Sequence, residues 1–443
     1  MPTPPSLPKC PSEEELALTL GRWQEQAQRF VDEMKGLADD VELSLRHQSL
    51  RGWRFSDQQL QALTPPPQGE CYIRVFRGGH TVWGRFPLSM KQWRSGITEL
   101  VKAFPPKSVG FYRPPQPMTQ HPQPTTFDPN MHKMLGDPLR FQRVAYAMSD
   151  NTWHEGERLL GMSHVEGSVT LHINHKVVCN LQGAVTNSKV TLDGRVRINH
   201  SYEDARQTLF APASFLPWAL LGSTLWRKRA SHPQVTTLQA GPYQVILHPR
   251  LLEKLLRVRL PLVCTYKHFE PEAQVGSPSL TLTHEPRADG MAESVMFDDL
   301  GRPRDPSPMI TQGSLVAPFS IDPLCAEWSP QGLRPRLTNF FIKPGKVSHA
   351  ELLQRSRATI QVENAHIEPL DERGPNHFTL RITEAITTEG QLLPPGRYKL
   401  SGTVASTAEG PGLLEASEFS KEVLDTSSAI LPFARLPLYL HPA

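Results

Sequence analysis

Short apolar segments separated by turn residues dominate the second half of the chain. Between residues 262 and 404 they run in the order LVCTY, SLTLT, SVMF, SLVAPF, TNFFI, ATIQVENAHI, HFTLRITEAITT and GRYKLSGTV. Segments of this length, rich in β-branched residues and bounded by glycine or proline, are typical of strands. Because so many short strands follow one another, we expect a sheet-rich domain that forms a barrel or a sandwich.

Two helices are also predicted in this half. A strand at residues 243–247 leads into HPRLLEKLLRVRL, where Pro249 suits the first turn of a helix. Farther on, Ser348 precedes Glu351 by three residues, which is the spacing of a capping box. We therefore expect one helix from residue 249 and a short one from residue 348.

The first half mixes helical and strand patterns. Ser12 and Glu15 form a capping-box pair before apolar residues at helical spacing up to position 34, and Ser89 precedes a second such stretch. Strands are predicted at 41–45, 71–76 and 81–86, the last two as a hairpin. Farther on, SVTLHINH, KVVCNL, KVTL and RVRI are predicted strands, and Asp193-Gly194 predicts a tight turn between the last two.

The length of the chain favours two domains. A chain of 443 residues exceeds what one hydrophobic core usually organises. We expect an α+β protein with a mixed α/β N-terminal domain at 1–234 and a sheet-rich, barrel-like C-terminal domain at 235–443. Eight of the 43 prolines fall at 105–129, where we expect an extended loop that serves as a lid or as a spacer.

Charge and cysteine patterns exclude several classes of protein. Lys and Arg number 47 against 44 Asp and Glu, without a basic stripe, so no nucleic-acid partner is expected. The five cysteines are far apart and form no CxxC pair, which favours a reducing, cytoplasmic location. The most apolar window, 210–226, is interrupted by Pro212 and Pro217, so we expect a buried segment there and no membrane span.

Two groups of residues are candidates for chemistry. His172, His175 and Cys179 have a spacing found among metal ligands, but residues three apart in a strand point to opposite faces. A metal site there stays an alternative to two ordinary strand histidines. Asp298 and Asp299 form an acidic pair, which serves a turn more often than acid and base catalysis.

Three stretches between residues 279 and 353 resemble the TldD/PmbA family: SLTLTHEP, ESVMFDDLGRP and LTNFFIKPGKVSHAELL. The family's FDDEG-type turn is matched here by Phe297, Asp298, Asp299 and Gly301. Its TNxxxxPGxxSxxEL segment is matched from Thr338 and Asn339 to Leu352. The family's glycine-rich FSxxxxG segment is represented only by HFTLRITEAITTEG, so the resemblance leaves the end of the barrel open.

The resemblance implies a metal-free subunit. Catalytic members of the family carry an HExxxH helix, and this chain has no such motif. At the corresponding place it reads HPRLLE, in which Pro249 replaces the carboxylate and Glu253 replaces the second histidine, leaving His248 alone. The chain thus resembles a divergent TldE/PmbA-type partner of an HExxxH-bearing TldD-like subunit. Zinc is expected in that partner and no cofactor in this chain.

The resemblance also implies a peptide substrate, such as the precursor of a ribosomal peptide whose leader is removed. Asn339, Phe340 and Phe341 are candidates for the border of a peptide groove, because a strand with aromatic residues offers an edge and apolar pockets. Burial of at least one of the two phenylalanines in the core is the competing interpretation. Two alternatives stay open: a stand-alone peptide-binding or scaffolding protein, and an enzyme whose metal site has moved to His172, His175 and Cys179.

Overall fold

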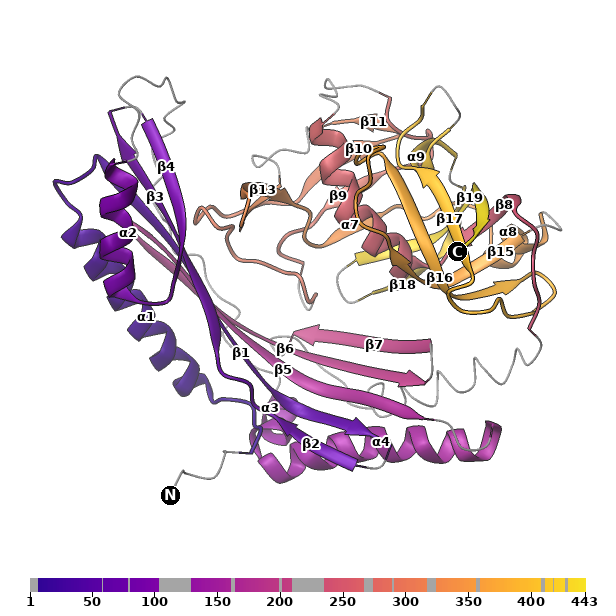
Figure 1. The fold of residues 1–443 in the computed structure, drawn as a ribbon, viewed down its shortest axis with the longest axis horizontal. Coiled ribbons are helices and arrows are strands. Elements are labelled where there is room, and N and C mark those ends of the chain that lie inside the picture. Colours follow the sequence, from indigo (N-terminus) through magenta and orange to yellow (C-terminus); the bar gives the residue numbers. More distant parts are fainter. Residues whose placement is uncertain are drawn as a thin grey trace.

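Each half of the chain is built around one large sheet (Figure 1). The computed structural model describes residues 7–57, 59–78, 80–102, 129–160, 164–198, 201–208, 235–266, 274–288, 291–316, 324–355, 359–407, 411–416, 418–426 and 429–443. The strands of the first sheet end at residue 208 and those of the second begin at residue 241. The predicted α+β class is confirmed.

The N-terminal sheet has seven antiparallel strands. They are β1 (Asp40–Ser56), β2 (Gln59–Leu63), β3 (Gln68–Arg77), β4 (His80–Pro87), β5 (Val165–Asn180), β6 (Gly183–Ile198) and β7 (Ser201–Thr208). The order is β4-β3-β1-β5-β6-β7, and β2 pairs with the end of β1. The hairpin predicted for 71–76 and 81–86 is confirmed, because β3 pairs with β4 in that register.

Helices cover one face of this sheet. They are α1 (Glu13–Glu33), α2 (Met90–Lys102), α3 (Pro129–Gly136) and α4 (Pro138–Leu160). The capping box at Ser12 is present, and α1 buries Leu20, Ala27, Phe30 and Val31 against odd-numbered residues of β1 and β5. The even-numbered residues of β5, such as Lys176 and Val178, therefore lie on the opposite, inner face, toward the C-terminal half (Figure 1).

The turn predicted at Asp193-Gly194 is wrong. Strand β6 continues through both residues and pairs on one side with β5 and on the other with β7. The hairpin turn lies instead at Leu181 and Gln182, between the paired residues Asn180 and Gly183. Pairing on both sides supplies the backbone hydrogen bonds that a turn would lose, and this tertiary context overrides the local Asp-Gly preference.

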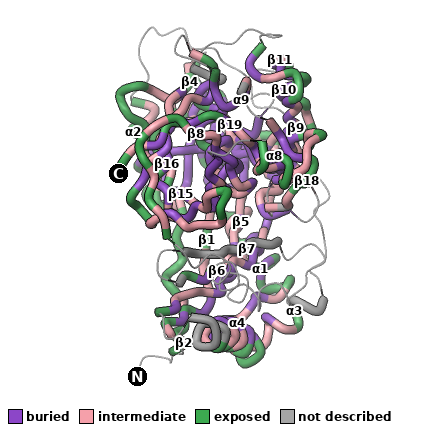
Figure 2. The backbone as a smooth tube through the Cα atoms, turned by 90° about the vertical axis from the view of Figure 1, so that its right-hand side faces the viewer, coloured by how far each residue is buried: buried purple, intermediate pink, exposed green. Residues whose placement is uncertain are grey.

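The C-terminal half contains the predicted barrel. Strands β8 (Gly241–Leu247), β15 (Thr359–Ile367), β16 (His377–Thr387), β17 (Tyr398–Thr403) and β19 (Ala429–Pro442) pair in that order, and β19 pairs with β8 to close the ring. The segment HFTLRITEAITT forms β16, so the end of the barrel is complete. Buried residues gather in the middle of this half, where β8, β16 and β19 lie (Figure 2).

Shorter elements extend the barrel. The added strands are β9 (Leu282–His284), β10 (Ser307–Thr311), β11 (Ser314–Leu315), β14 (Phe340–Ile342) and β18 (Glu418–Asp425). The helices are α7 (Pro249–Tyr266), α8 (His349–Gln354) and α9 (Leu413–Ala416), and the predicted capping box at Ser348 is present in α8. A separate hairpin, β12 (Cys325–Ser329) with β13 (Gly332–Arg336), belongs to neither large sheet.

Two predicted strands of this half are wrong. Residues 262–266, LVCTY, continue helix α7, because Leu256, Leu260 and Val263 keep the helical spacing and pack into the barrel core. Residues 294–297, SVMF, form an irregular segment, since Phe297 turns away from the barrel to pack on the N-terminal sheet beside Val178.

Several predictions concern residues that the structure describes in part or not at all. The loop at 105–129 lies outside the described residues except for Pro129, which begins α3. The apolar window at 210–226 also lies outside them. Among the helices that are described, none combines the length and the apolar character needed to cross a membrane.

Candidate functional site

Helix α7 begins at the position where the sequence resemblance places the family's metal motif. The His248 ring is mostly buried, accepts the backbone N–H of Arg250 at its Nδ1 (3.3 Å), and has its Nε2 3.8 Å from Glu363 Oε2. Phe433 packs edge-on against the same ring, with 5.5 Å between centroids. Pro249 follows and offers neither a ligand nor a base.

Glu253, one turn farther along α7, is held by Arg257. Its Oε1 lies 2.8 Å from Arg257 Nη2, while Nη1 of the same guanidinium donates to the carbonyl oxygens of Leu337 and Thr338. In the described part of the chain, no three His, Cys, Asp or Glu side chains come together as a metal-binding group. The residues at the start of α7 therefore do not fit a zinc site, which needs about three ligands and an open position.

His172, His175 and Cys179 are not brought together. His175 lies on the helix-covered face, where its Nδ1 is 2.7 Å from Ser188 Oγ, and burial, followed by the charge of His47, lowers its pKa to about 4. His172 lies on the inner face with Nε2 3.3 Å from Asp193 Oδ2. Burial raises the pKa of the Cys179 thiol to about 12. The alternative of a metal site at these residues therefore has no structural support.

The predicted peptide groove at Asn339, Phe340 and Phe341 also needs correction. Asn339 and Phe340 are fully buried, and Asn339 donates to Ser294 Oγ at 2.8 Å. Strand β14 pairs with β9 on one side and with β19 on the other, so it has no edge to which a peptide strand could add. Only Phe341 is partly exposed.

The acidic pair, Asp298 and Asp299, lies in a tight turn. Asp298 is completely buried and accepts the backbone N–H groups of Leu300 and Arg302, at 2.9 and 3.1 Å. Its carboxylate also binds the guanidinium groups of Arg302 and Arg304, at 2.9 and 3.1 Å. Gly301 has a φ of 73°, as this tight turn requires. Asp298 therefore serves the turn, as the sequence predicted.

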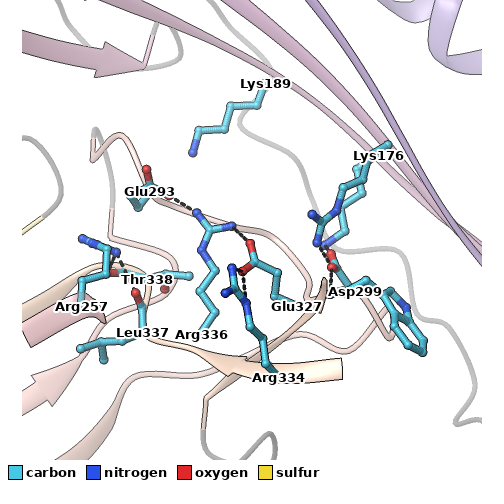
Figure 3. Close-up of polar contacts among 12 residues, drawn as sticks. Lys176, Lys189, Arg257, Glu293, Asp299, Glu327, Arg334, Arg336, Leu337 and Thr338 are labelled. Carbon is cyan, nitrogen blue, oxygen red and sulfur yellow. Dashed lines mark hydrogen bonds and ion pairs between the residues drawn. The ribbon is translucent and has the colours of Figure 1, made fainter. Parts of the chain in front are cut away.

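Asp299 has a different role, because it reaches across to the inner face of the N-terminal sheet. Its Oδ2 pairs with Arg46 of β1 and its Oδ1 lies 2.6 Å from Nζ of Lys176 on β5 (Figure 3). Lys176 also donates to the carbonyl of Phe297 at 3.0 Å. Burial, with a smaller effect of Arg46, lowers the pKa of the Lys176 amine to about 7. One carboxylate thus joins two strands of one half to a turn of the other.

The β12–β13 hairpin completes this junction with aromatic side chains. The Trp328 ring stacks on Tyr72 of β3, with 5.3 Å between centroids and 8° between planes, and it lies 5.2 Å from Trp83 of β4. Gly332, at the turn of the hairpin, has a φ of 114°, and a Cβ there would lie 3.3 Å from Trp83. The Trp328 backbone N–H donates to Asp299 at 2.7 Å, so the hairpin and the turn form one unit.

A chain of ion pairs continues from the hairpin toward β6. Arg336 binds Glu293 and Glu327, and Arg334 binds Glu327 at 2.6 Å (Figure 3). Burial alone would lower the pKa of Arg336, but the two carboxylates outweigh it and raise that pKa. Lys189 of β6 donates to the backbone carbonyls at 292 and 294. The junction between the halves is therefore polar over most of its extent.

Most residues of this junction were missed by the sequence reasoning. The FDDLG motif pointed to Asp298 and Asp299, but nothing local distinguishes Arg46 or Lys176 from other charged residues of alternating strands. Their partner lies more than a hundred positions away, so only the folded structure reveals the contact. The sole available signal was that both occupy polar positions in strands whose other face is apolar.

Comparisons with known proteins agree with this architecture. Residues 240–395 match the family model of the PmbA/TldA metallopeptidase C-terminal domain. The fold is similar to that of TldE from Thermococcus kodakarensis, with a TM-score of 0.71 and 13% identity over 93% of this chain and 99% of that chain. No curated protein sequence matches the chain significantly.

Two other solved structures have a similar fold, and both are named as proposed modulators of DNA gyrase. The protein from Thermotoga maritima has a TM-score of 0.65 and 15% identity, covering 95% of this chain and 100% of its own. The protein from Bacteroides thetaiotaomicron has a TM-score of 0.66 and 14% identity, covering 98% of this chain and 100% of its own. Because the fold extends over nearly the whole of each chain, both halves of the present structure have counterparts in these proteins.

Proposed function

Because the chain belongs to the TldD/PmbA family, we propose that it is the non-catalytic, TldE-type subunit of a heterodimeric zinc metallopeptidase. The partner is an HExxxH-bearing TldD-like subunit, and the substrate is an unfolded peptide, such as a ribosomal peptide precursor that loses its leader. A cytoplasmic location, with neither nucleic acid nor a membrane as partner, belongs to the same proposal.

One observation carries the proposal: the start of α7 lacks the groups that zinc hydrolysis requires. A catalytic zinc needs about three protein ligands, an open position for water and a carboxylate that takes the proton from that water. Here Pro249 lies where that carboxylate is expected. Glu253 lies where the second histidine is expected, and its carboxylate forms an ion pair with Arg257. The zinc and the proton transfer are therefore assigned to the partner.

In this arrangement the chain contributes binding and confinement. A closed barrel and a sheet covered by helices make two rigid bodies that can form walls of a chamber around the partner's zinc. A narrow chamber admits an extended peptide and excludes a folded protein, because a folded domain is wider than a single strand. No residue of this chain takes or gives a proton in the reaction.

The proposal is tested by producing the chain with and without an HExxxH-bearing, TldD-like chain. We expect the two chains to copurify, zinc to be present at about one equivalent per heterodimer, and peptide cleavage to need both chains. In the complex, Glu→Gln in the partner's HExxxH motif should abolish cleavage. The matched variant in this chain, His248→Ala, should leave cleavage unchanged.

Peptide cleavage by this chain alone, or its loss on His248→Ala with the complex intact, would overturn the proposal. The alternative of a stand-alone peptide-binding protein was based on the weak match of HFTLRITEAITTEG to the family's glycine-rich segment. Since that segment forms β16 of a closed barrel, no observation now favours it. It remains an outcome of the same experiment: a chain that fails to copurify with the TldD-like chain and yet binds a peptide.

A further inference from the structure

The described contacts between the two halves are mostly polar. The barrel core and the two cores under the helices each lie within one half. Among the described residues, a small buried apolar cluster of Val178, Val185 and Phe297 joins them, beside the aromatic contacts of Trp328 with Tyr72 and Trp83. Junctions of this kind resemble transient interfaces, for which relative motion of the domains is the default expectation.

The C-terminal contribution to this junction comes from two adjoining segments. Residues 292–299 contact Arg46, Lys176 and Lys189, and the β12–β13 hairpin contacts Tyr72 and Trp83. The segments are tied together by the N–H groups at 326 and 328, which donate to Asp298 and Asp299. Among the described elements, no helix or strand of one half packs extensively along one of the other.

We propose that the segment at residues 292–304 and the β12–β13 hairpin form a releasable latch, which holds the barrel against the inner face of the N-terminal sheet and lets the two halves separate as rigid bodies. We call this unit the latch. Opening exposes the inner face of β5 and β6 around Lys176 and Lys189, while the barrel core and the two cores under the helices stay intact. The inference concerns this chain by itself and does not depend on the proposed function.

Asp299 is the centre of the latch. It is nearly fully buried and pairs with Arg46 and Lys176, which lie on neighbouring strands in paired register. Without its carboxylate, the Arg46 guanidinium would keep a charge with little exposure and without that ion pair, while the Lys176 amine, whose pKa is already about 7, would lose its proton and its partner. Removing one partner from a buried charge network is strongly unfavourable, because the other charges remain desolvated. Loss of Asp299 should therefore favour the open state.

Asp305 offers a matched control in the same segment. Its side chain is 82% exposed and pairs with Arg287, which belongs to the same half. Asp299→Asn and Asp305→Asn remove the same charge from positions six residues apart in sequence. Only the first substitution affects a contact with the N-terminal sheet.

Opening can be measured by thiol labelling of two buried probes. Val185→Cys places a thiol at the junction, beneath Phe297, and Val190→Cys places one in a core that lies wholly within the N-terminal half. Labelled peptides are quantified by mass spectrometry, so that native cysteines do not interfere. The junction probe reports separation of the halves, whereas the core probe reports unfolding of the N-terminal half.

We expect the junction thiol to react faster than the core thiol in the otherwise unaltered chain. Adding Asp299→Asn should raise the rate at the junction by about tenfold or more and leave the core thiol unchanged. Asp305→Asn should change neither rate. Should Asp299→Asn fail to fold, Trp328→Ala serves in its place, because it removes the stacking on Tyr72 and keeps the charges.

Equal rates for the two probes, or an equal increase at both in the latch variants, would overturn the proposal. Either result would mean that the junction opens only when the N-terminal half unfolds. Heterodimer formation and peptide cleavage do not enter this measurement, so its failure leaves the proposed function untouched.

Discussion

Acidification should weaken the N-terminal half through His175. This ring is 4% exposed, lies 5.6 Å from the His47 ring and contacts Ser188. Its pKa is about 4 in the folded chain, against about 6.5 in an unfolded one. Between these values the unfolded chain binds more protons, so stability falls as the pH drops through 6.5 toward 4 and no further below that.

The expected magnitude follows from the two pKa values. Between about pH 7.5 and pH 5, this one histidine should reduce the free energy of unfolding by about 2 kcal/mol. His47 should add to the effect, because burial lowers its pKa as well. In His175→Gln, which can keep a hydrogen bond to Ser188, the contribution of about 2 kcal/mol should disappear.

Urea unfolding at the two pH values measures this difference. Unfolding is followed by the fluorescence of the eight tryptophans, among which Trp23 has its ring 5.5 Å from His47. His154→Gln serves as the control, because that side chain is 65% exposed. If His175→Gln loses as much stability on acidification as the unaltered chain does, the assignment of the acid sensitivity to His175 is refuted.

Four further substitutions test the packing of the C-terminal half in urea unfolding at neutral pH. Phe340→Ala, at a buried position, should lower the free energy of unfolding by about 3–5 kcal/mol. Phe341→Ala, at a partly exposed position, should lower it by about 1 kcal/mol. Equal losses for the two variants would contradict the burial described. Ser348→Ala should cost about 1 kcal/mol by removing a helix cap, and an unchanged midpoint would show that the cap contributes nothing. Gly345→Ala should lower the free energy of unfolding by about 1–3 kcal/mol, because a Cβ there would lie 1.8 Å from the carbonyl oxygen of Phe419. An unchanged free energy of unfolding would mean that the backbone segments at Gly345 and Phe419 move apart easily.

The elements that the sequence predicted well are those with a complete local signal. The capping boxes at Ser12 and Ser348 and the proline at position 249 each start a helix where expected. Their physical cause is confined to one turn of helix, so it is visible in a few residues. The barrel was also foreseen, since many short strands have few other ways to bury their apolar faces.

The predictions that failed are those in which distant contacts override local preference. The Asp193-Gly194 signal gives way to pairing on both sides of β6, and the predicted strand at 262–266 instead continues α7, because the barrel core holds the apolar face of that helix. At the candidate site, the sequence located the start of α7 and the acidic pair. It did not connect Asp299 with Arg46 and Lys176, which belong to another sheet.

The closure of the barrel by β19 has a consequence for how the chain acquires its structure. Strand β8 pairs with β19 from Leu247 and Ala434 at one end to Gly241 and Leu440 at the other. These partners are among the most distant in sequence of any in the barrel, so their contact forms only after a large entropic cost of loop closure.

Until β19 has been synthesised, β8 keeps an open edge and the core of this half lacks Leu431, Leu436, Leu438 and Leu440. Exposed strand edges beside apolar surface promote aggregation. A nascent chain that already carries its entire N-terminal half should therefore depend on chaperones, and a fragment that ends at residue 426 should precipitate when it is released from the ribosome.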